Sequence, residues 1–240
     1  MQSFPYKAVV FDWAYTLVDL VEECDEKAFE RIYQKMQGWG WNLPEYKVVY
    51  DHYREVFEMM VHQSRSTHQE ARFEEVLKLL LLSHYKEKVE NEKIRELLRE
   101  YYEEIYKPRK VYDETIPVLQ ELQGKGVRMG IISNTTNPDF MKDYERELLG
   151  LSPYFEFSIY SSGVPFRKPH PSIYEIALTR LSVPVEEILF VGDSPLTDIA
   201  GPQAVGMHTA WLNREDAPHP EPIRPHYVIH SLADLLEISQ

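Results

Sequence analysis

The residues best suited to chemistry follow three short apolar segments of the 240-residue chain. The segments are VVF, GII and LFVG, and the polar residues after them are Asp12 and Thr16, Ser133 and Asn134, and Asp193 and Asp198. Lys168 stands before a proline between the second and third segments. Carboxylates, hydroxyls and a lysine that converge on one place would suit the transfer of a phosphoryl group.

Each of these residue types has a distinct use in that chemistry. A carboxylate such as Asp12 can attack phosphorus and form an acyl phosphate, which water then hydrolyses. Two anions approach each other only when their charge is neutralised, and Mg²⁺ held by carboxylates does this. A lysine adds a fixed positive charge, while hydroxyl and backbone N–H groups bind the phosphate oxygens. The residues therefore predict a metal-assisted phosphoryl-transfer site.

Four apolar segments predict the strands that position these side chains. They are Ala8–Phe11, Val127–Ile132, Ile188–Val191 and Thr209–Leu212. Segments that are apolar throughout are typical of a parallel sheet covered on both faces. Helical patterns lie between the strands, which predicts a doubly wound, Rossmann-like α/β fold with a parallel sheet. In such a sheet ligands bind beyond the carboxyl ends of the strands, where the candidate residues stand.

The helices that cover this sheet are predicted at Thr115–Leu122 and Ser172–Leu181. The end of the chain, HYVIHSLADLLEIS, predicts one more short strand followed by a terminal helix. Both patterns fit the alternation of strands and helices that a doubly wound fold requires.

Residues 18–107 have a different pattern, with almost no glycine after Gly40 and apolar residues at helical spacing. The repeats are Phe29, Ile32, Tyr33 and Met36, then Phe73, Val76, Leu77, Leu80 and Leu81, then Ile94, Leu97, Leu98, Tyr101 and Ile105. They predict an all-helical insert of about four helices, placed after the first strand. The α/β core would then consist of residues 1–17 and 108–240.

Composition limits the partners that the chain can have. Hydrophobic residues make up 43%, enough for a sizeable core, and the net charge of −13 argues against nucleic acid or an anionic membrane. A small phosphorylated metabolite remains possible because it needs only local positive charge. The single cysteine, Cys24, cannot form an internal disulfide, and MQSFPYK leads into a strand without the apolar core of a signal peptide. We therefore expect a cytoplasmic protein that is a monomer or a homodimer.

Four motifs in order resemble those of the haloacid dehalogenase superfamily, in its phosphatase branch with a helical cap. The first family motif is Asp-x-Asp-x-Thr, and this chain has Asp12-Trp13-Ala14-Tyr15-Thr16. The second is a Ser or Thr that closes an apolar strand, here Ser133, and the third is a Lys before Pro, here Lys168. The fourth is Gly-Asp with a later Asp, here Gly192-Asp193 and Asp198. The closing pattern HYVIHSLADLLE is similar to that of phosphoglycolate-phosphatase-like members.

This resemblance implies a role for each residue. Asp12 would be the nucleophile, and Lys168 would bridge Asp12 and the phosphate. The phosphoryl group would contact Thr16, Ser133 and Asn134. The Mg²⁺ ligands would be Asp12, the backbone carbonyl of Ala14, Asp193 and Asp198. The function so implied is a Mg²⁺-dependent phosphatase that acts on a small phosphorylated metabolite through an aspartyl-phosphate.

Ala14 departs from the pattern, because the family places there the aspartate that protonates the leaving group and then activates water. Alanine keeps the carbonyl but supplies no proton, and a positioned acid or base is worth about 10²–10⁴-fold in rate. Three interpretations follow: a phosphatase that is slow or takes its proton elsewhere, a C–P bond hydrolase, or a phosphate-binding regulatory protein with little turnover.

The second interpretation depends on Trp13-Ala14, which phosphonoacetaldehyde hydrolases also carry. In those enzymes a Schiff-base lysine from the cap handles the leaving group. However, Tyr15 replaces their glycine, Lys168 replaces their usual arginine, and the insert shows no segment like their lysine motif. A haloacid dehalogenase proper needs no metal, so Asp193 and Asp198 favour the phosphatase branch.

Overall fold

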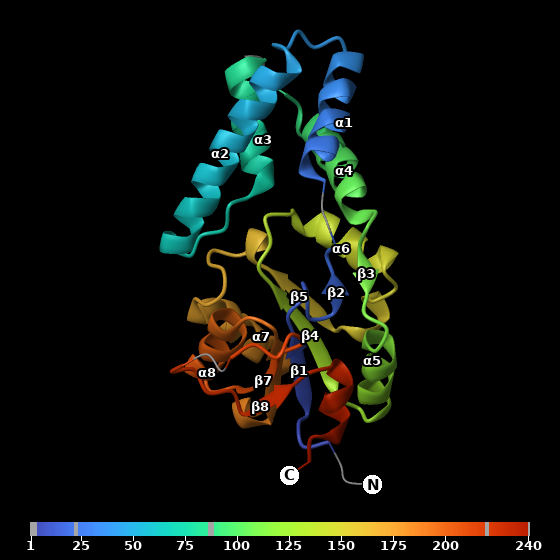
Figure 1. Ribbon diagram of the computed structural model, residues 1–240, viewed down its shortest axis with the longest axis vertical. Coiled ribbons are helices and arrows are strands. Elements are labelled where there is room, and N and C mark those ends of the chain that lie inside the picture. Colours follow the sequence, from blue (N-terminus) through green and yellow to red (C-terminus); the bar gives the residue numbers. More distant parts are fainter. Residues whose placement is uncertain (1–3, 22–23, 86–88, 219–220, 240) are drawn as a thin grey trace.

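The computed structural model describes residues 4–21, 24–85, 89–218 and 221–239. A six-stranded parallel sheet forms its centre, in the order β5-β4-β1-β6-β7-β8 (Figure 1). The strands are β1 (Ala8–Phe11), β4 (Arg128–Ser133), β5 (Phe157–Tyr160), β6 (Ile188–Gly192), β7 (His208–Leu212) and β8 (Tyr227–Ile229). This arrangement confirms the predicted doubly wound α/β fold.

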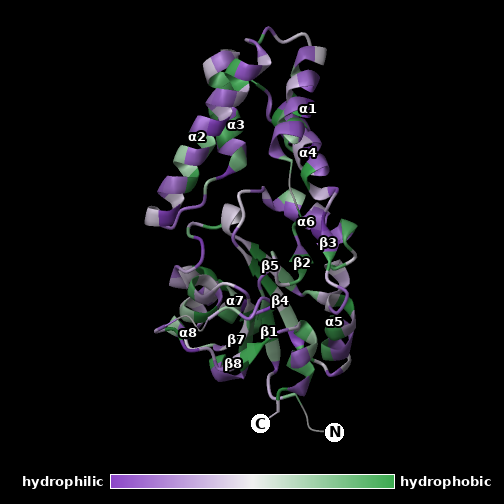
Figure 2. Cartoon of the chain, viewed as in Figure 1, coloured by the Kyte–Doolittle hydropathy of each residue, from purple (hydrophilic) through white to green (hydrophobic). Residues whose placement is uncertain are grey.

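Helices cover both faces of the sheet, and β1 shows why its sequence is apolar throughout. Val9 and Phe11 pack in one hydrophobic cluster with α5 (Thr115–Gly124), whereas Ala8 and Val10 pack in another with α7 (Pro171–Leu181). Successive side chains of a strand point to opposite faces, so a strand buried on both faces has no place for a polar residue. Figure 2 shows the central strands as mainly hydrophobic.

Four helices form an insert on the carboxyl side of the sheet (Figure 1). They are α1 (Asp25–Gly38), α2 (Tyr46–Thr67), α3 (Phe73–His84) and α4 (Asn91–Tyr106). Their predicted apolar repeats are buried together in one cluster, which confirms the helical insert. Where the chain enters and leaves it, β2 (Val18–Asp19) and β3 (Lys110–Val111) pair antiparallel.

The helix α6 (Asp139–Leu148) connects the two parts of the molecule. Its residue Met141 is buried in the hydrophobic cluster of the insert, although α6 follows β4 in the chain. One side of α6 therefore faces the insert helices, and the loop before it lies at the carboxyl end of β4.

Several elements were not predicted from the sequence, among them β2, β3, α6 and α8 (Gly201–Ala204), or differ from the prediction. The strand β5 was not predicted, because FSIY is a short segment on the edge of the sheet and has no long apolar pattern. The terminal helix, Leu232–Glu237, is a 3₁₀-helix with a capping box on Ser231. Among the residues described, no helix combines the length and apolar character needed to cross a membrane.

Candidate active site

Strand register brings the three predicted strand ends together. In the sheet Phe11 of β1 is paired with Ile131 of β4 on one side and with Val191 of β6 on the other. The backbone N–H of Asp12 still donates to the carbonyl of Val191, at 2.9 Å. Since all strands of this sheet are parallel, Asp12 lies between the end of β4, whose last residue is Ser133, and the end of β6, which Asp193 follows.

Lys168 makes the closest contacts to the candidate nucleophile. Its Nζ donates to Oδ1 of Asp12 and to Oδ1 of Asp198, each at 2.6 Å, and the residue is 2% exposed. Burial alone would lower the pKa of Lys168, but the charges of Asp12 and Asp198 raise it above its ordinary value. Lys168 is therefore a fixed ammonium between two carboxylates.

The side chain of Asn134 positions the backbone of Lys168. Its Nδ2 donates to the carbonyl of Lys168 at 2.9 Å, and the N–H of Lys168 donates to its Oδ1 at 2.8 Å. These two bonds connect the end of β4 to the loop that carries the lysine. A contact between Asn134 and a phosphoryl group stays a prediction. In the structure the Asn134 amide binds the backbone of Lys168.

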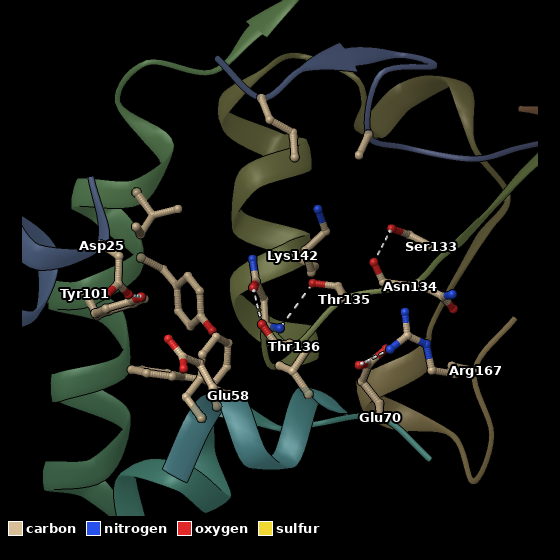
Figure 3. Close-up of a pocket in the computed structure, with 18 of the residues that line it drawn as sticks. Asp25, Glu58, Glu70, Tyr101, Ser133, Asn134, Thr135, Thr136, Lys142 and Arg167 are labelled. Atoms are coloured by element: carbon tan, nitrogen blue, oxygen red, sulfur yellow. Dashed lines mark hydrogen bonds and ion pairs between the residues drawn. The ribbon is translucent and has the colours of Figure 1, made fainter. Parts of the chain in front are cut away.

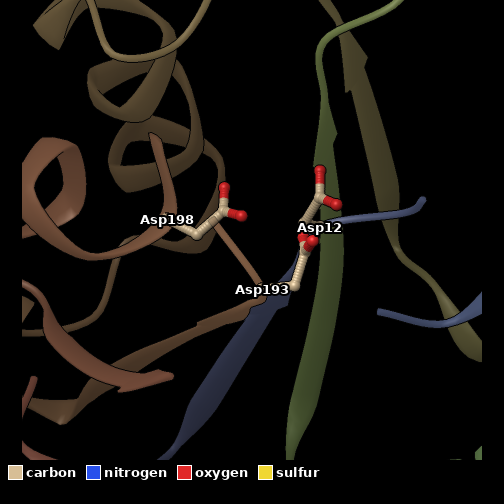
Figure 4. Close-up of side chains that lie close together, drawn as sticks. All are labelled: Asp12, Asp193 and Asp198. Atoms are coloured by element: carbon tan, nitrogen blue, oxygen red, sulfur yellow. The ribbon is translucent and has the colours of Figure 1, made fainter. Parts of the chain in front are cut away.

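Three carboxylates gather at this point: Asp12, Asp193 and Asp198 each offer an oxygen within 4.8 Å of the other two (Figure 4). Burial, with the charges of Asp12 and Asp198 acting in the same direction, raises the pKa of Asp193 to about 7. Burial also raises the pKa of Asp12 to about 6, against the opposing effect of Lys168. The cluster thus has more negative charge than one lysine balances, and its oxygen donors suit a hard cation such as Mg²⁺.

Asp198 is the most constrained of the three. Its Oδ2 accepts from the N–H of Ser194 at 3.0 Å, and its Oδ1 accepts from Thr197 at 3.1 Å as well as from Lys168. Gly192 passes so close that an added Cβ would lie 2.5 Å from the Asp198 side chain. The Gly-Asp motif therefore has a steric reason, because only glycine lets the strand end run beside this carboxylate.

Thr16 and Ser133 are both buried next to the cluster. The Thr16 hydroxyl has no hydrogen-bond partner among the described residues, and Thr16 is fully buried. Ser133 is 2% exposed, and its hydroxyl makes one 3.5 Å contact with the carbonyl of Asn134. Their contacts with a phosphoryl group stay predictions.

A cavity of about 640 Å³ lies between the strand ends and the insert helices. Ser133 and Asn134 line it from the core (Figure 3). Trp13 and Ala14 line it from the same side. Its insert side is aromatic, with Tyr50, Tyr53, Phe57, Phe73, Tyr101 and Tyr102. Its charged lining residues are Asp25, Arg54, Glu58, Arg65, Glu70, Arg109, Lys142 and Arg167.

Asp25 organises part of the aromatic wall. Its Oδ1 accepts hydrogen bonds from Tyr53, at 2.6 Å, and from Tyr101, while its Oδ2 accepts from Tyr50 at 3.3 Å. Three helices of the insert are joined at one carboxylate that faces the cavity. The sequence shows no sign of this cluster, because Asp25, the Tyr50–Tyr53 pair and Tyr101 are far apart in the chain.

Sequence reasoning also missed Lys142, which lines the cavity from α6. It is 3% exposed and donates to Glu145, which is fully buried and lies 3.3 Å from Nε of Arg109. A lysine and a glutamate three residues apart on a helix usually form an exposed pair. No signal in the sequence separates the buried case from that one.

A family model decides the classification of the chain. The model of the haloacid dehalogenase-like hydrolases matches residues 6–206. The chain belongs to the haloacid dehalogenase-like hydrolase family. The match includes all four motifs and the helical insert, so it agrees with the placement of the motifs at the strand ends.

Two curated relatives in this family are similar over part of the chain. A glyceraldehyde 3-phosphate phosphatase of Pyrococcus abyssi is 41% identical over 96 residues, which are 40% of this chain and 39% of that protein. The pyrimidine 5'-nucleotidase YjjG of Escherichia coli is 31% identical over 124 residues, 51% of this chain and 54% of the relative. The chain spans about half the length of the curated relatives it matches.

Solved structures of the haloacid dehalogenase-like fold match nearly the whole chain. The 2-haloacid dehalogenase of Pseudomonas syringae pv. Tomato DC3000 has a TM-score of 0.74 and 24% identity over 97% of each chain, which shows the shared fold. A HAD phosphatase of Thermococcus onnurineus has a TM-score of 0.67 and 27% identity over 96% of each chain.

Proposed function

We propose that the protein is a Mg²⁺-dependent phosphatase that acts on a small phosphorylated metabolite through an aspartyl-phosphate on Asp12. The observation that carries this proposal is the contact of Lys168 with both Asp12 and Asp198, inside a cluster of three carboxylates. The cluster lies beside a cavity large enough for a metabolite. Relatives named as phosphatases of glyceraldehyde 3-phosphate and of phosphoserine support this class of substrate.

In this proposal the nucleophile is prepared by its neighbours. With a pKa of about 6, Asp12 is ionised at neutral pH and can attack phosphorus. Lys168 holds one of its oxygens, which leaves the other oxygen for the attack. The same ammonium lies where it can stabilise charge on the transferring phosphoryl oxygens. Thr16 and Ser133 would donate hydroxyl hydrogen bonds to that group.

The metal would be held by Asp12, the Ala14 carbonyl, Asp193 and Asp198. When bound, Mg²⁺ would neutralise the surplus negative charge and allow an anionic substrate to approach. Asp198 already accepts hydrogen bonds from Ser194, Thr197 and Lys168, so we assign it chiefly to the orientation of Lys168. Asp198 would bind the cation directly or through a water molecule.

Residues 18–107 would act as a cap that closes over this site. Contacts already join the insert to the core: Arg167 binds Glu70 at 3.2 Å and Ser64 at 2.8 Å, and the N–H of Phe73 donates to Thr136 at 3.0 Å. Because Arg167 precedes Lys168, movement of the cap is coupled to the loop that carries the lysine. A closed cap would exclude water during the first step.

Phosphate release from a panel of phosphoesters, with Mg²⁺ and with EDTA, tests the proposal. We expect release that requires Mg²⁺ and that Asp12→Asn abolishes while the fold is retained. Phosphonoacetaldehyde in the same panel separates C–P bond hydrolysis from phosphatase activity. A protein that releases phosphate from no compound, but that phosphate and Mg²⁺ together stabilise against heat, would be a binding protein instead.

A further inference from the structure

The site as described assigns no group to protonate the leaving oxygen, since the Lys168 ammonium is held between Asp12 and Asp198. Ala14 has no proton to give, and Asp12, Asp193 and Asp198 form the nucleophile and the cation cluster. Without protonation, an alkyl leaving group departs as an unstable alkoxide. A positioned proton donor lowers that barrier and is worth about 10²–10⁴ in rate. A phosphatase that hydrolyses alkyl esters therefore needs another donor in the cavity.

Lys142 is a buried cation of the core that faces the same cavity as Ala14. It lines the same cavity as Ser133 (Figure 3), and Trp13 and Ala14 are lining residues of that cavity too. Its Nζ lies 4.6 Å from the centre of the Trp13 ring. Since Trp13 separates Asp12 from Ala14 in the chain, the lysine stands next to the first motif and on the cavity that would hold the substrate.

The surroundings of Lys142 make its ammonium a better acid than an exposed lysine. Burial lowers its pKa, and the positive charge of Arg109 acts in the same direction. Glu145, its hydrogen-bond partner, and the more distant Asp12 oppose this effect and keep the proton available. A donor whose pKa is closer to neutral transfers its proton more readily.

The position is also costly in structural terms. A buried pair such as Lys142 and Glu145 contributes little net stability, because taking both charges out of water offsets their attraction. A methionine and a glutamine of similar size would pack the same space at no such cost. A functional role of Lys142 in the cavity therefore explains the pair better than a contribution to the stability of α6.

We propose that Lys142 replaces the missing carboxylate of position 14 as the proton donor of this active site. In the first step Asp12 bonds to phosphorus, the bond to the leaving oxygen breaks, and that oxygen takes a proton from the Lys142 ammonium. In the second step water attacks the phosphorus, the bond from phosphorus to Asp12 breaks, and the proton lost by water returns to the Lys142 amine. The inference rests on the proposed phosphatase function.

Leaving-group dependence distinguishes this role from a structural one. We would compare p-nitrophenyl phosphate, whose leaving group departs without a proton, with phenyl phosphate and glycerol 3-phosphate. In Lys142→Met we expect kcat/KM for glycerol 3-phosphate to fall about 10²-fold or more, and that for p-nitrophenyl phosphate to change less than about threefold. The alkaline limb of the glycerol 3-phosphate pH profile should disappear at the same time.

A second variant protects the test against misfolding. Lys142→Met leaves Glu145 paired with Arg109 at 3.3 Å, and Lys142→Gln is the second variant because it keeps a polar side chain beside Glu145 without an acidic proton. It should show the same split between the two substrates. Adding Ala14→Asp to it should restore turnover of glycerol 3-phosphate, because the carboxylate then supplies the proton.

Several results would overturn the inference. An equal loss with p-nitrophenyl phosphate and glycerol 3-phosphate in the folded Lys142→Met and Lys142→Gln variants would assign Lys142 a structural role. Cleavage of phosphonoacetaldehyde with borohydride trapping of Lys142 would assign the amine to a Schiff base. By contrast, turnover that survives Asp12→Asn would refute the phosphatase mechanism itself, whatever Lys142 does.

Discussion

Replacing Asp193 by asparagine tests whether the carboxylate cluster stores repulsion that a cation would relieve. Burial, and then the charges of Asp12 and Asp198, raise the pKa of Asp193 to about 7 in the folded protein. In the unfolded chain an aspartate ionises near pH 3.9. The folded state thus holds the proton more tightly. This contribution to stability is fully present below about pH 4 and is lost as the pH rises towards 7.

The size of the effect follows from the same values. The difference between an ordinary aspartate and a pKa of about 7 corresponds to about 4 kcal/mol at pH 8. Because Asp193 is partly exposed, water reduces this amount, and we expect Asp193→Asn to raise the free energy of unfolding by about 2 kcal/mol. At pH 4.5 the gain should be below about 1 kcal/mol, since the wild-type carboxyl is then protonated in the folded state.

Urea denaturation in EDTA, followed by tryptophan fluorescence at pH 4.5 and 8, measures both values. Asp113→Asn is a matched control, because it removes an aspartate charge at an exposed position. Mg²⁺ at pH 8 should stabilise the wild type and the control but have much less effect on Asp193→Asn. An asparagine variant that is no more stable than the wild type at pH 8 without metal would refute the repulsion argument.

Three further predictions concern the same structure. Gly130→Ala should lower the free energy of unfolding by about 3 kcal/mol in urea titrations, because the new Cβ would lie 2.2 Å from the Phe157 ring, and adding Phe157→Leu should recover part of the loss. Gly192→Ala should weaken Mg²⁺ binding in calorimetry and lower kcat at least tenfold, because the new Cβ would displace Asp198. Unchanged Mg²⁺ binding would show that Asp198 is not displaced. Mg²⁺ affinity should fall as the pH drops from 8 to 5.5, because protons compete with the cation for Asp12 and Asp193, whose pKa values are about 6 and 7. An affinity that does not change with pH would show that these carboxylates are not ligands.

The sequence by itself determined the fold class and the chain positions of the candidate site. A strand buried on both faces has to be apolar throughout, as in Ala8–Phe11, and helices that share a core have to repeat at helical spacing, as in Ile94–Ile105. Residues directly after such strands, Asp12, Ser133 and Asp193, are brought together by the parallel topology itself. These are local patterns with one structural outcome, so they can be read without coordinates.

Only the tertiary structure decided which other side chains face the site. The Lys142–Glu145 pair would read the same on an exposed helix, and its burial depends on the insert helices that pack against α6. Asn134 holds the backbone of Lys168, and Asp25 of α1 joins tyrosines from α2 and α4, through contacts between residues far apart in the chain. Burial and long-range contact are properties of the packed molecule, and no local pattern of residue types encodes them.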